Sequence, residues 1–242
     1  MSRVVLANRL PPHFASSDEL RSAWVDTDDF LAELPTTFST TPRSFYATLG
    51  QRNLSGFVGE VFKSALHHHT RWLQPNPHPD GRPDLLDLGS AAALEHYINE
   101  CHDSRSHLPV KSLLTPFRFG GFEVKCAVGS VRSAAEFPIC RSRVHAVTGI
   151  TYWAHHKHAC KLIGLYYDFV EEANGCPEIK AIFMADISID HWAEVSTGRP
   201  DRKKTSNTSI LKPGMDLVKQ GLVGYDPSED YVVMLRRIGV PI

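Results

Sequence analysis

Residues 122–126 read Phe122-Glu123-Val124-Lys125-Cys126, so apolar and polar side chains alternate along this stretch. Successive side chains of a β-strand point to opposite faces of a sheet. The pattern therefore predicts a strand with Glu123 and Lys125 on one face and the three apolar residues towards the core. The polar pair would lie roughly 6.8 Å apart, at about 3.4 Å per residue. Taken alone, an acid beside a lysine is also typical of a solvated strand face.

The clearest helix in the sequence precedes this strand. Between residues 54 and 66, apolar residues recur at alternating spacings of three and one, which makes one continuous stripe along a helix. The opposite side of the helix is polar and carries Glu60 and Lys63. We expect the apolar stripe to pack on the sheet.

The first 52 residues predict a helical N-terminal region. Ser16 and Glu19 have the spacing of a capping box ahead of an apolar run. A second short helix over residues 28–34 is expected to end at Pro35, because proline cannot continue the helical hydrogen bonds.

Strand and helix signals alternate through the remaining chain. The expected elements are a short strand after Pro83, a helix over 91–100 capped by Ser90, a hairpin or strand pair over 117–128 around Gly120 and Gly121, a helix over 147–158, strands over 162–170 and 179–185, a helix over 213–221 and a strand over 231–235. This order predicts an α/β fold with a mixed β-sheet flanked by helices. No linker marks a boundary, so we expect a single domain over 1–242, with the N-terminal region 1–52 followed by a core over 53–242.

Composition is that of a soluble globular protein. Apolar residues make up 42% and charged residues 22% of the 242 residues, and 26 basic residues nearly balance 27 acidic ones. No stretch approaches 18 consecutive apolar residues, and the five cysteines lack C-x-x-C spacing. We therefore expect a cytoplasmic protein with no membrane segment, disulfide framework or structural zinc site. The near-neutral charge selects no partner, because a local basic cleft is enough to attract nucleic acid.

A second acidic residue gives the Glu-x-Lys strand a chemical interpretation. Asp84 follows Pro83 at the start of the expected short strand, where it can converge with Glu123 on one metal ion. Two carboxylates with waters and a phosphate oxygen suit Mg²⁺, which keeps several of its waters in proteins. Lys125 can hold the attacking water or lower its pKa, and can offset the charge that builds on the phosphate. These residues predict a centre for phosphodiester hydrolysis.

Pro83-Asp84, followed after 38 residues by Glu123-Val124-Lys125, resembles the motif of the PD-(D/E)xK nuclease superfamily, and within it the type II restriction endonucleases. Glu60 lies on the preceding helix, where family members often carry a glutamate. The matching order covers residues 54–126, about a third of the chain. The gap between Asp84 and Glu123 is longer than in the commonest family pattern and needs the helix over 91–100 as an insertion.

The resemblance implies a restriction-endonuclease-like mixed sheet flanked by helices and Mg²⁺-dependent cleavage of double-stranded DNA, usually by a homodimer on a short palindrome. It implies Asp84 and Glu123 as metal ligands, with Lys125 and Glu60 completing the catalytic residues. Glu60 has the alternative of an ordinary solvated helix residue. Two other acids, Asp80 and Asp87, are rivals for the place of Asp84, which is preferred because it leads the apolar run.

Two locally basic segments are candidates for DNA contact. One follows the Glu-x-Lys strand, and the other is a polar stretch in the second half of the chain. Arginine and asparagine recognise guanine and adenine edges, whereas lysine suits phosphates. The alternative for the second segment is a solvated surface loop. The candidate residues are Arg132, Arg141, Arg143, Arg199, Arg202, Lys203, Lys204 and Asn207.

Other reaction chemistries lack their motifs. Histidines cluster at 67–69 and at 155–158, but no H-E-x-x-H pattern accompanies them, and the chain has no G-x-S-x-G, Walker loop or G-x-G-x-x-G. We therefore expect a sequence-specific double-stranded DNA endonuclease of the type II restriction class, acting with Mg²⁺ as a homodimer. One alternative is a repair, recombination or structure-selective nuclease of the same fold. Another is a non-catalytic DNA-binding or protein-interaction domain in which the acids and lysine are surface charges.

Overall fold

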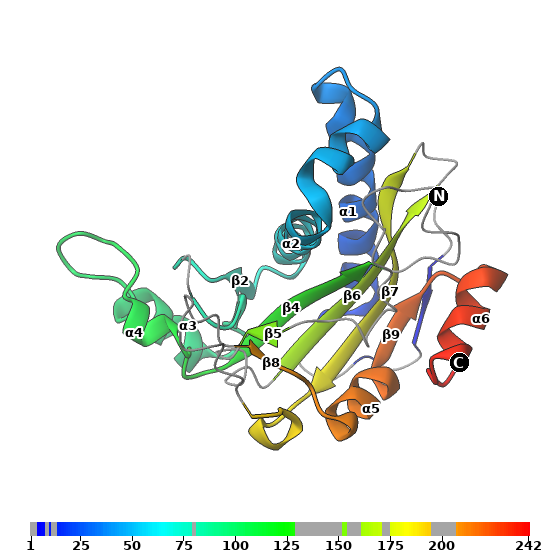
Figure 1. The fold of residues 1–242 in the computed structure, drawn as a ribbon. Coiled ribbons are helices and arrows are strands. Elements are labelled where there is room, and N and C mark those ends of the chain that lie inside the picture. Colours follow the sequence, from blue (N-terminus) through cyan, green and yellow to red (C-terminus); the bar gives the residue numbers. More distant parts are fainter. Residues whose placement is uncertain are drawn as a thin grey trace, which may run out of the picture.

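The computed structural model describes residues 4–7, 10, 14–78, 81–128, 152–153, 161–170, 175–194 and 207–242, and it shows an α/β fold (Figure 1). The strands are β1 (Val5–Leu6), β2 (Leu73–Pro75), β3 (Leu85–Asp87), β4 (Gly121–Val128), β5 (Tyr152–Trp153), β6 (Lys161–Val170), β7 (Cys176–Asp186), β8 (Asn207–Thr208) and β9 (Leu222–Tyr225). The helices are α1 (Ser17–Thr37), α2 (Pro42–Thr70), α3 (Ala91–Asn99), α4 (Lys111–Leu114), the short 3-10 helix η5 (Ile189–His191), α5 (Lys212–Gln220) and α6 (Glu229–Arg237).

Seven strands form one mixed sheet in the order β1-β9-β7-β6-β4-β3-β2, and β5 pairs with β8 in a separate ribbon. Within the seven-stranded sheet β4 and β6 are parallel, whereas the other neighbouring strands are antiparallel. The expected mixed sheet is therefore confirmed. Its strand β4 lies between β6 and the short β3, which places the Glu-x-Lys stretch next to the strand that follows Asp84.

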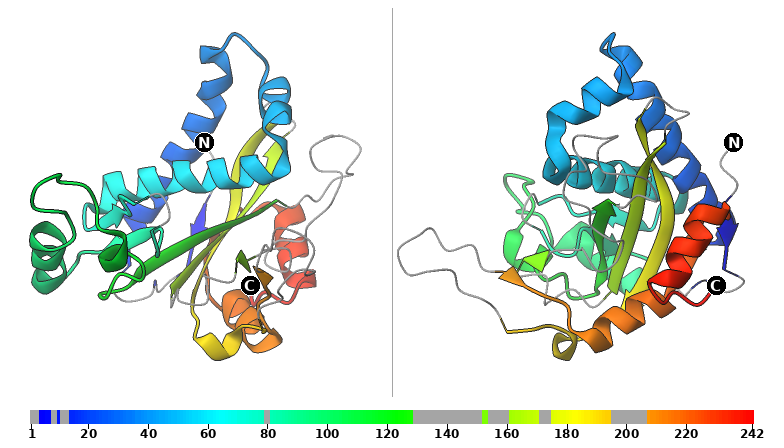
Figure 2. Two further views of the ribbon diagram at one scale, coloured as in Figure 1. Left: turned by 60° about the vertical axis from the view of Figure 1, so that its left-hand side comes forward. Right: turned by 45° about the vertical axis from the view of Figure 1, so that its right-hand side comes forward.

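Helices cover both faces of the sheet (Figures 1 and 2). On one face, Trp24 of α1 and Phe62 of α2 share a core with Ile163 of β6. On the other face, Val218 of α5 and Leu235 of α6 belong to a second core, which alternate residues of the strands complete. The sheet is buried between these two layers, as the apolar content of the central strands requires. Within the described ranges no helix is long and apolar enough to span a membrane.

The N-terminal helices confirm one expectation and correct another. Glu19 N donates to Ser16 Oγ and Ser16 N donates to Glu19 Oε2, which is the expected capping box. The expected break at Pro35 is wrong, because α1 runs continuously through it. Proline has no N–H for the carbonyl of Leu31, and the hydroxyl of Tyr46 donates to that carbonyl instead. A contact from α2 thus compensates for the bond that proline removes.

The expected helices over 54–66, 91–100 and 213–221 are confirmed within α2, α3 and α5, and the strands over 162–170 and 179–185 within β6 and β7. Ser90 caps α3, where its Oγ accepts from Ala93 N at 3.1 Å. These elements have a clear apolar period or cap in their own sequence.

Two expected elements are wrong at the positions that the structure describes. Residues 117–128 do not fold back on themselves, because β4 begins at Gly121 and takes β3 as its antiparallel partner. The expected helix over 147–158 is wrong at Tyr152–Trp153, which form β5, and its remaining residues lie outside the described ranges. In both places the pairing partner is distant in sequence, so local patterns could not supply it.

The expected strand over 231–235 is also wrong, because these residues lie in α6. The first turn of α6 is acidic and its last turn carries Arg236 and Arg237, which complements the helix dipole. Met234 and Leu235 are buried against the α5 side of the sheet, whereas Val233 is 54% exposed. The apolar run is therefore only partly buried, as expected for a surface helix.

Candidate active site

Asp84 lies where the pairing of β3 with β4 ends. The register joins Leu85 to Phe122, so Asp84 is the first residue beyond the ladder. Its Oδ2 accepts a hydrogen bond from the backbone N–H of Val124 at 2.8 Å. The N–H of Val124 is thus paired with a side-chain oxygen instead of a backbone carbonyl of β3. This hydrogen bond holds the carboxylate of Asp84 beside Glu123 and Lys125.

Hydrogen bonds from Asn76 and a close approach at Gly121 fix the backbone around Asp84. Asn76 N donates to the carbonyl of Asp84 at 2.9 Å, and Asn76 Nδ2 donates to the carbonyl of Pro83 at 3.1 Å. Gly121 has a φ of 151°, and a Cβ atom there would lie 1.9 Å from the carbonyl oxygen of Leu85. Only glycine allows this close approach of β4 to β3. Asp84 therefore sits on a constrained segment.

The structure brings Asp84, Glu123 and Lys125 together. Lys125 Nζ lies 2.6 Å from Glu123 Oε1 and 3.8 Å from Asp84 Oδ2. The side chains of Lys125 and Asp84 are 17% and 18% exposed, whereas that of Glu123 is only 1% exposed. Glu123 therefore does not lie on a solvated strand face, and the cluster is more buried than alternation alone predicts.

The apolar residues of the same strand face the core as expected. Phe122 and Val124 belong to the core beneath α1 and α2, and Cys126 packs against it. A Cβ atom on Gly59 of α2 would come within 3.2 Å of Cys126 Sγ, so glycine lets the helix approach β4 closely. Burial raises the pKa of Cys126 to about 12. The thiol is therefore neutral at physiological pH and is no candidate nucleophile.

A second lysine, Lys63 of α2, belongs to the cluster and has no role in the sequence-based hypothesis. Its Nζ lies 3.7 Å from Asp84 Oδ1 and 2.7 Å from Glu60 Oε1. The side chain of Lys63 is 11% exposed, whereas that of Glu60 is 70% exposed. Glu60 thus joins the cluster through Lys63. The sequence did contain a signal for the role of Lys63. Glu60 and Lys63 are three residues apart on the polar side of α2, and residues at this spacing are neighbours on a helix.

Opposing electrostatic effects act on the carboxyl group of Glu123. Burial raises the pKa of Glu123, Lys125 acts to lower it, and the nearby carboxylate of Asp84 raises it further. Two carboxylates close together favour binding of a cation or a proton. Lysines lie on both sides of Asp84 and partly neutralise it.

The carboxylates of Asp84 and Glu123 suit Mg²⁺ better than a structural zinc ion. Mg²⁺ is usually bound through one or two carboxylates and keeps several waters, which matches the pair Asp84 and Glu123. A structural zinc site needs four nitrogen or sulfur ligands. Among the residues that the structure describes, no group of three or more His, Cys, Asp or Glu side chains is arranged to hold a metal.

Of the remaining candidates, Asp87 and Asn207 lie within the described residues, and the others lie outside them. Asp87 is at the other end of β3, roughly 10 Å from Asp84 at about 3.3 Å per residue, and its Oδ1 accepts from Gly89 N. Asn207 lies in β8 opposite Trp153 of β5. The candidates that lie outside the described ranges are Asp80, Arg132, Arg141, Arg143, Arg199, Arg202, Lys203 and Lys204.

Comparisons of the chain with family models, with curated proteins and with solved structures give no match. The resemblance to the PD-(D/E)xK nucleases therefore stays a prediction. The fold and the clustering of Asp84, Glu123 and Lys125 are the observations from which a function is inferred.

Proposed function

We propose that the protein is a Mg²⁺-dependent DNA endonuclease with its active site at Asp84, Glu123 and Lys125. One observation carries the proposal. Two carboxylates with 38 residues between them in sequence lie 3.8 Å and 2.6 Å from the same lysine nitrogen. Glu123 is nevertheless 1% exposed, and a buried carboxylate with a raised pKa beside a second acid is typical of functional sites.

Each residue of the cluster has a distinct role in this proposal. Asp84 and Glu123 would hold Mg²⁺, which supplies charge stabilisation at the phosphate and activation of water. Lys125 places a positive charge where negative charge develops on the phosphate oxygens. The N–H of Val124 orients Asp84, and Lys63 balances its charge from the α2 side.

The substrate and assembly belong to the same proposal. Double-stranded DNA is the proposed substrate, cleaved at a specific sequence as in the type II restriction class. Arg199, Arg202 and Asn207 would contact base edges, and Lys203 and Lys204 would contact phosphates. Arg132, Arg141 and Arg143 would lie along the DNA backbone. A homodimer would place one site on each strand, because a subunit of this size covers about one half-site of a palindrome.

Plasmid cleavage tests the proposed activity. The full chain is incubated with supercoiled plasmid in Mg²⁺ or in EDTA, beside Asp84→Asn. This variant keeps an oxygen for the Val124 N–H but loses the charge. Discrete fragments that require Mg²⁺ and disappear in Asp84→Asn are expected. Asp29→Asn, an exposed acid on α1, is the matched control and should cut like the parent.

The other outcomes separate the alternatives. A metal-dependent smear or cleavage of branched substrates alone would contradict sequence specificity and indicate a repair or structure-selective nuclease. Plasmid that stays intact under all conditions would contradict nuclease activity and favour a binding domain. Sedimentation that shows a monomer which only nicks DNA would contradict the homodimer.

A further inference from the structure

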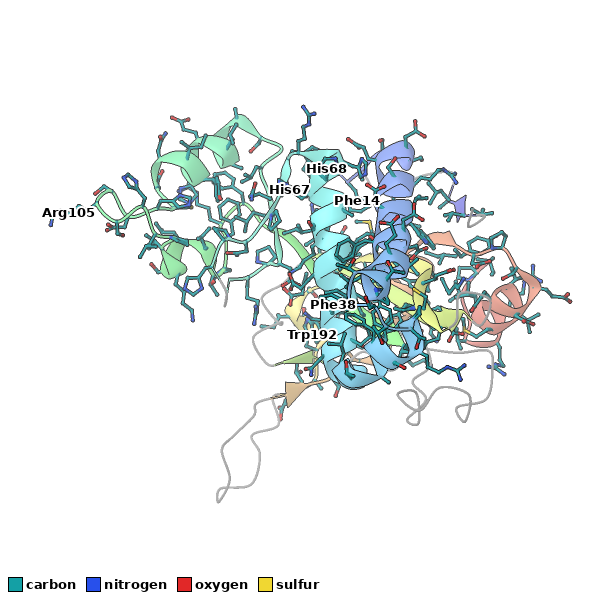
Figure 3. The ribbon with its side chains drawn as sticks, turned by 90° about the horizontal axis from the view of Figure 1, so that it is seen from above. Phe14, Phe38, His67, His68, Arg105 and Trp192 are labelled. Atoms are coloured by element: carbon teal, nitrogen blue, oxygen red, sulfur yellow. The ribbon has the colours of Figure 1, made fainter. Side chains whose placement is uncertain are left out.

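A cavity of about 590 Å³ lies at the end of β3 opposite to Asp84. It is lined by Phe14, Trp72, Phe119, Asp87 and residues 88–90. Phe14 is seen near the end of α2 that carries His67 and His68 (Figure 3). The volume is within the range of small-molecule sites, which also combine apolar walls with a few polar groups.

Three aromatic rings from distant parts of the sequence converge on this cavity. Trp72 follows α2, Phe14 precedes α1 and Phe119 precedes β4. Phe14 packs on Phe122 with 5.4 Å between ring centroids, and Phe119 packs on His96 with 5.5 Å between centroids. Both rings are therefore held in place by neighbours. Such walls suit a flat aromatic ligand, because bases stack on aromatic side chains with little sequence preference.

The polar side chains that line the cavity are those of Asp87 and Ser90. Ser90 Oγ already accepts from Ala93 N as the cap of α3, so the carboxylate of Asp87 is the charged group of the cavity. Its Oδ1 accepts from Gly89 N at 3.0 Å, which orients the group. A Cβ atom on Gly89 would lie 3.2 Å from Asp87 Oδ1 and 3.4 Å from the Trp72 ring, so a side chain at 89 would crowd the space between them. An ionised carboxylate only accepts hydrogen bonds. The ligand must therefore present N–H donors on its edge.

A cation stacks on Phe119, one of the aromatic residues that line the cavity. The guanidinium carbon of Arg118 lies 4.7 Å from the centroid of Phe119, and Arg118 is exposed. A cation already stacked on one of the aromatic walls disfavours a second cation in the cavity. It suits a phosphate group, which arginine binds well. Arg118 thus favours a nucleotide over a quaternary ammonium ligand, which the carboxylate of Asp87 alone would also attract.

We propose that this cavity binds a guanine base of a nucleotide or of an unpaired nucleic acid strand. Guanine is the base whose edge presents adjacent imino and amino donors to a carboxylate. The base stacks on Trp72, its donors face Asp87 and its phosphate lies towards Arg118. Asp87 is roughly 10 Å from Asp84 along β3, about three base steps of B-DNA at 3.4 Å per nucleotide. The site would thus lie within reach of a strand bound at the proposed active site, but its binding chemistry is independent of cleavage.

Calorimetric titration of the full chain with 5′-GMP in EDTA tests the proposal, with AMP, CMP, UMP and choline as competing probes. We expect saturable binding that favours GMP and falls at least fivefold in Asp87→Asn. Trp72→Ala should lower affinity roughly 5- to 150-fold, as expected for loss of one stacking ring. Arg118→Ala should weaken GMP but leave guanosine, which lacks the phosphate, unchanged. Asp29→Asn is the control and should bind like the parent.

Several results would overturn the proposal. The first is that the parent shows no saturable binding of GMP. The second is that all four nucleotides bind equally and Asp87→Asn does not change their binding. The third is that choline binds more tightly than GMP. Circular dichroism of each variant checks the fold, and the exposed Arg118 provides a variant that keeps the core intact. Because the titration contains no metal and no DNA, its failure leaves the plasmid test standing, and failure of the plasmid test leaves GMP binding standing.

Discussion

Asp28 of α1 and Glu123 of β4 are both buried carboxylic acids, 6% and 1% exposed, yet their surroundings differ. Asp28 Oδ1 accepts from the backbone N–H of Ile179 at 2.9 Å, and its Oδ2 accepts from Trp24 Nε1 at 3.0 Å. Burial raises the pKa of Asp28, and both hydrogen bonds act to lower it. Asp28 therefore joins α1 to β7 through the hydrogen bond from Ile179. The hydrogen bond from Trp24 lies within α1 and fixes the other oxygen of the carboxyl group.

Glu123 has a different set of neighbours. Its Oε1 accepts from the flexible side chain of Lys125, and an oxygen of the second carboxylate, Asp84, lies 3.8 Å from the same ammonium nitrogen. Placing two acids together in a buried site costs stability, and proteins keep such arrangements where function needs them. The difference shows that burial alone does not distinguish one acid from the other. What distinguishes Glu123 is the group of charged side chains around it, and the proposed function rests on that group.

The largest expected difference between the two acids is in cleavage. Glu123→Gln keeps the shape of the side chain and removes its charge. We expect it to lower the rate of plasmid cleavage roughly 100- to 1,000-fold, since loss of one stabilising group in a preorganised site costs about 2.7–4 kcal/mol of barrier. Asp28→Asn should retain the parent rate per folded molecule. Cleavage by Glu123→Gln at the parent rate would remove Glu123 from the site.

The second expected difference is in folding stability. Asp28→Ala leaves the buried N–H groups of Trp24 and Ile179 without their acceptor, each at a cost of about 1–3 kcal/mol. We expect the free energy of unfolding to fall by roughly 2–5 kcal/mol in urea titrations. The neighbouring Asp29→Ala, which changes an exposed acid, should stay within about 0.5 kcal/mol of the parent. Equal stability of the two variants would contradict the role of Asp28 as a link between α1 and β7.

The third expected effect concerns the pH dependence that Glu123 contributes. Because the pKa of Glu123 is raised in the folded protein, the folded state holds a proton at pH values where the unfolded state has lost it. The free energy of unfolding therefore falls as pH rises through that window. Glu123→Gln removes this fall, so at pH 8 it should be more stable than the parent, by roughly 0.5–2 kcal/mol. At pH 4, below the window, urea titrations should show little difference. A variant that is less stable than the parent at pH 8 would contradict the sign.

The smallest expected effect concerns Lys63. Its cation neutralises Asp84, and a charge pair about 4 Å apart contributes about 1 kcal/mol in a water-like dielectric. Lys63→Met should therefore lower the Mg²⁺ concentration for half-maximal cleavage about fivefold. Lys212→Met, an exposed lysine on α5, is the control. Glu60→Gln should change this concentration less than Lys63→Met does, because Glu60 reaches Asp84 through Lys63. A larger effect of Glu60→Gln than of Lys63→Met would indicate that Glu60 acts directly at the proposed metal site.

Local sequence predicted the elements that carry their own period or cap. The apolar stripe in α2, the alternation in β4 and the Ser16 capping box each describe contacts between residues close in the chain, and all three are present. The same local logic predicted the residues of the cluster, because an acid leading one strand and a Glu-x-Lys stretch on another converge once the strands are neighbours. It failed at α6, where a short apolar run is compatible with either a helix or a strand.

Tertiary structure decided what depends on partners distant in sequence. The strands that carry Asp84 and Glu123 were expected to be neighbours, but local pattern did not indicate their antiparallel register, Leu85 opposite Phe122. It also did not indicate that Tyr46 donates to the carbonyl of Leu31 that Pro35 leaves without a helical donor. Lys63 became part of the cluster because Gly59 lets α2 lie against β4. The burial of Glu123 likewise results from the packing around the sheet. The sequence by itself thus determined which chemical groups are present and how they alternate along each element. Packing alone determined their dielectric surroundings and their partners, because both depend on residues far away in the chain.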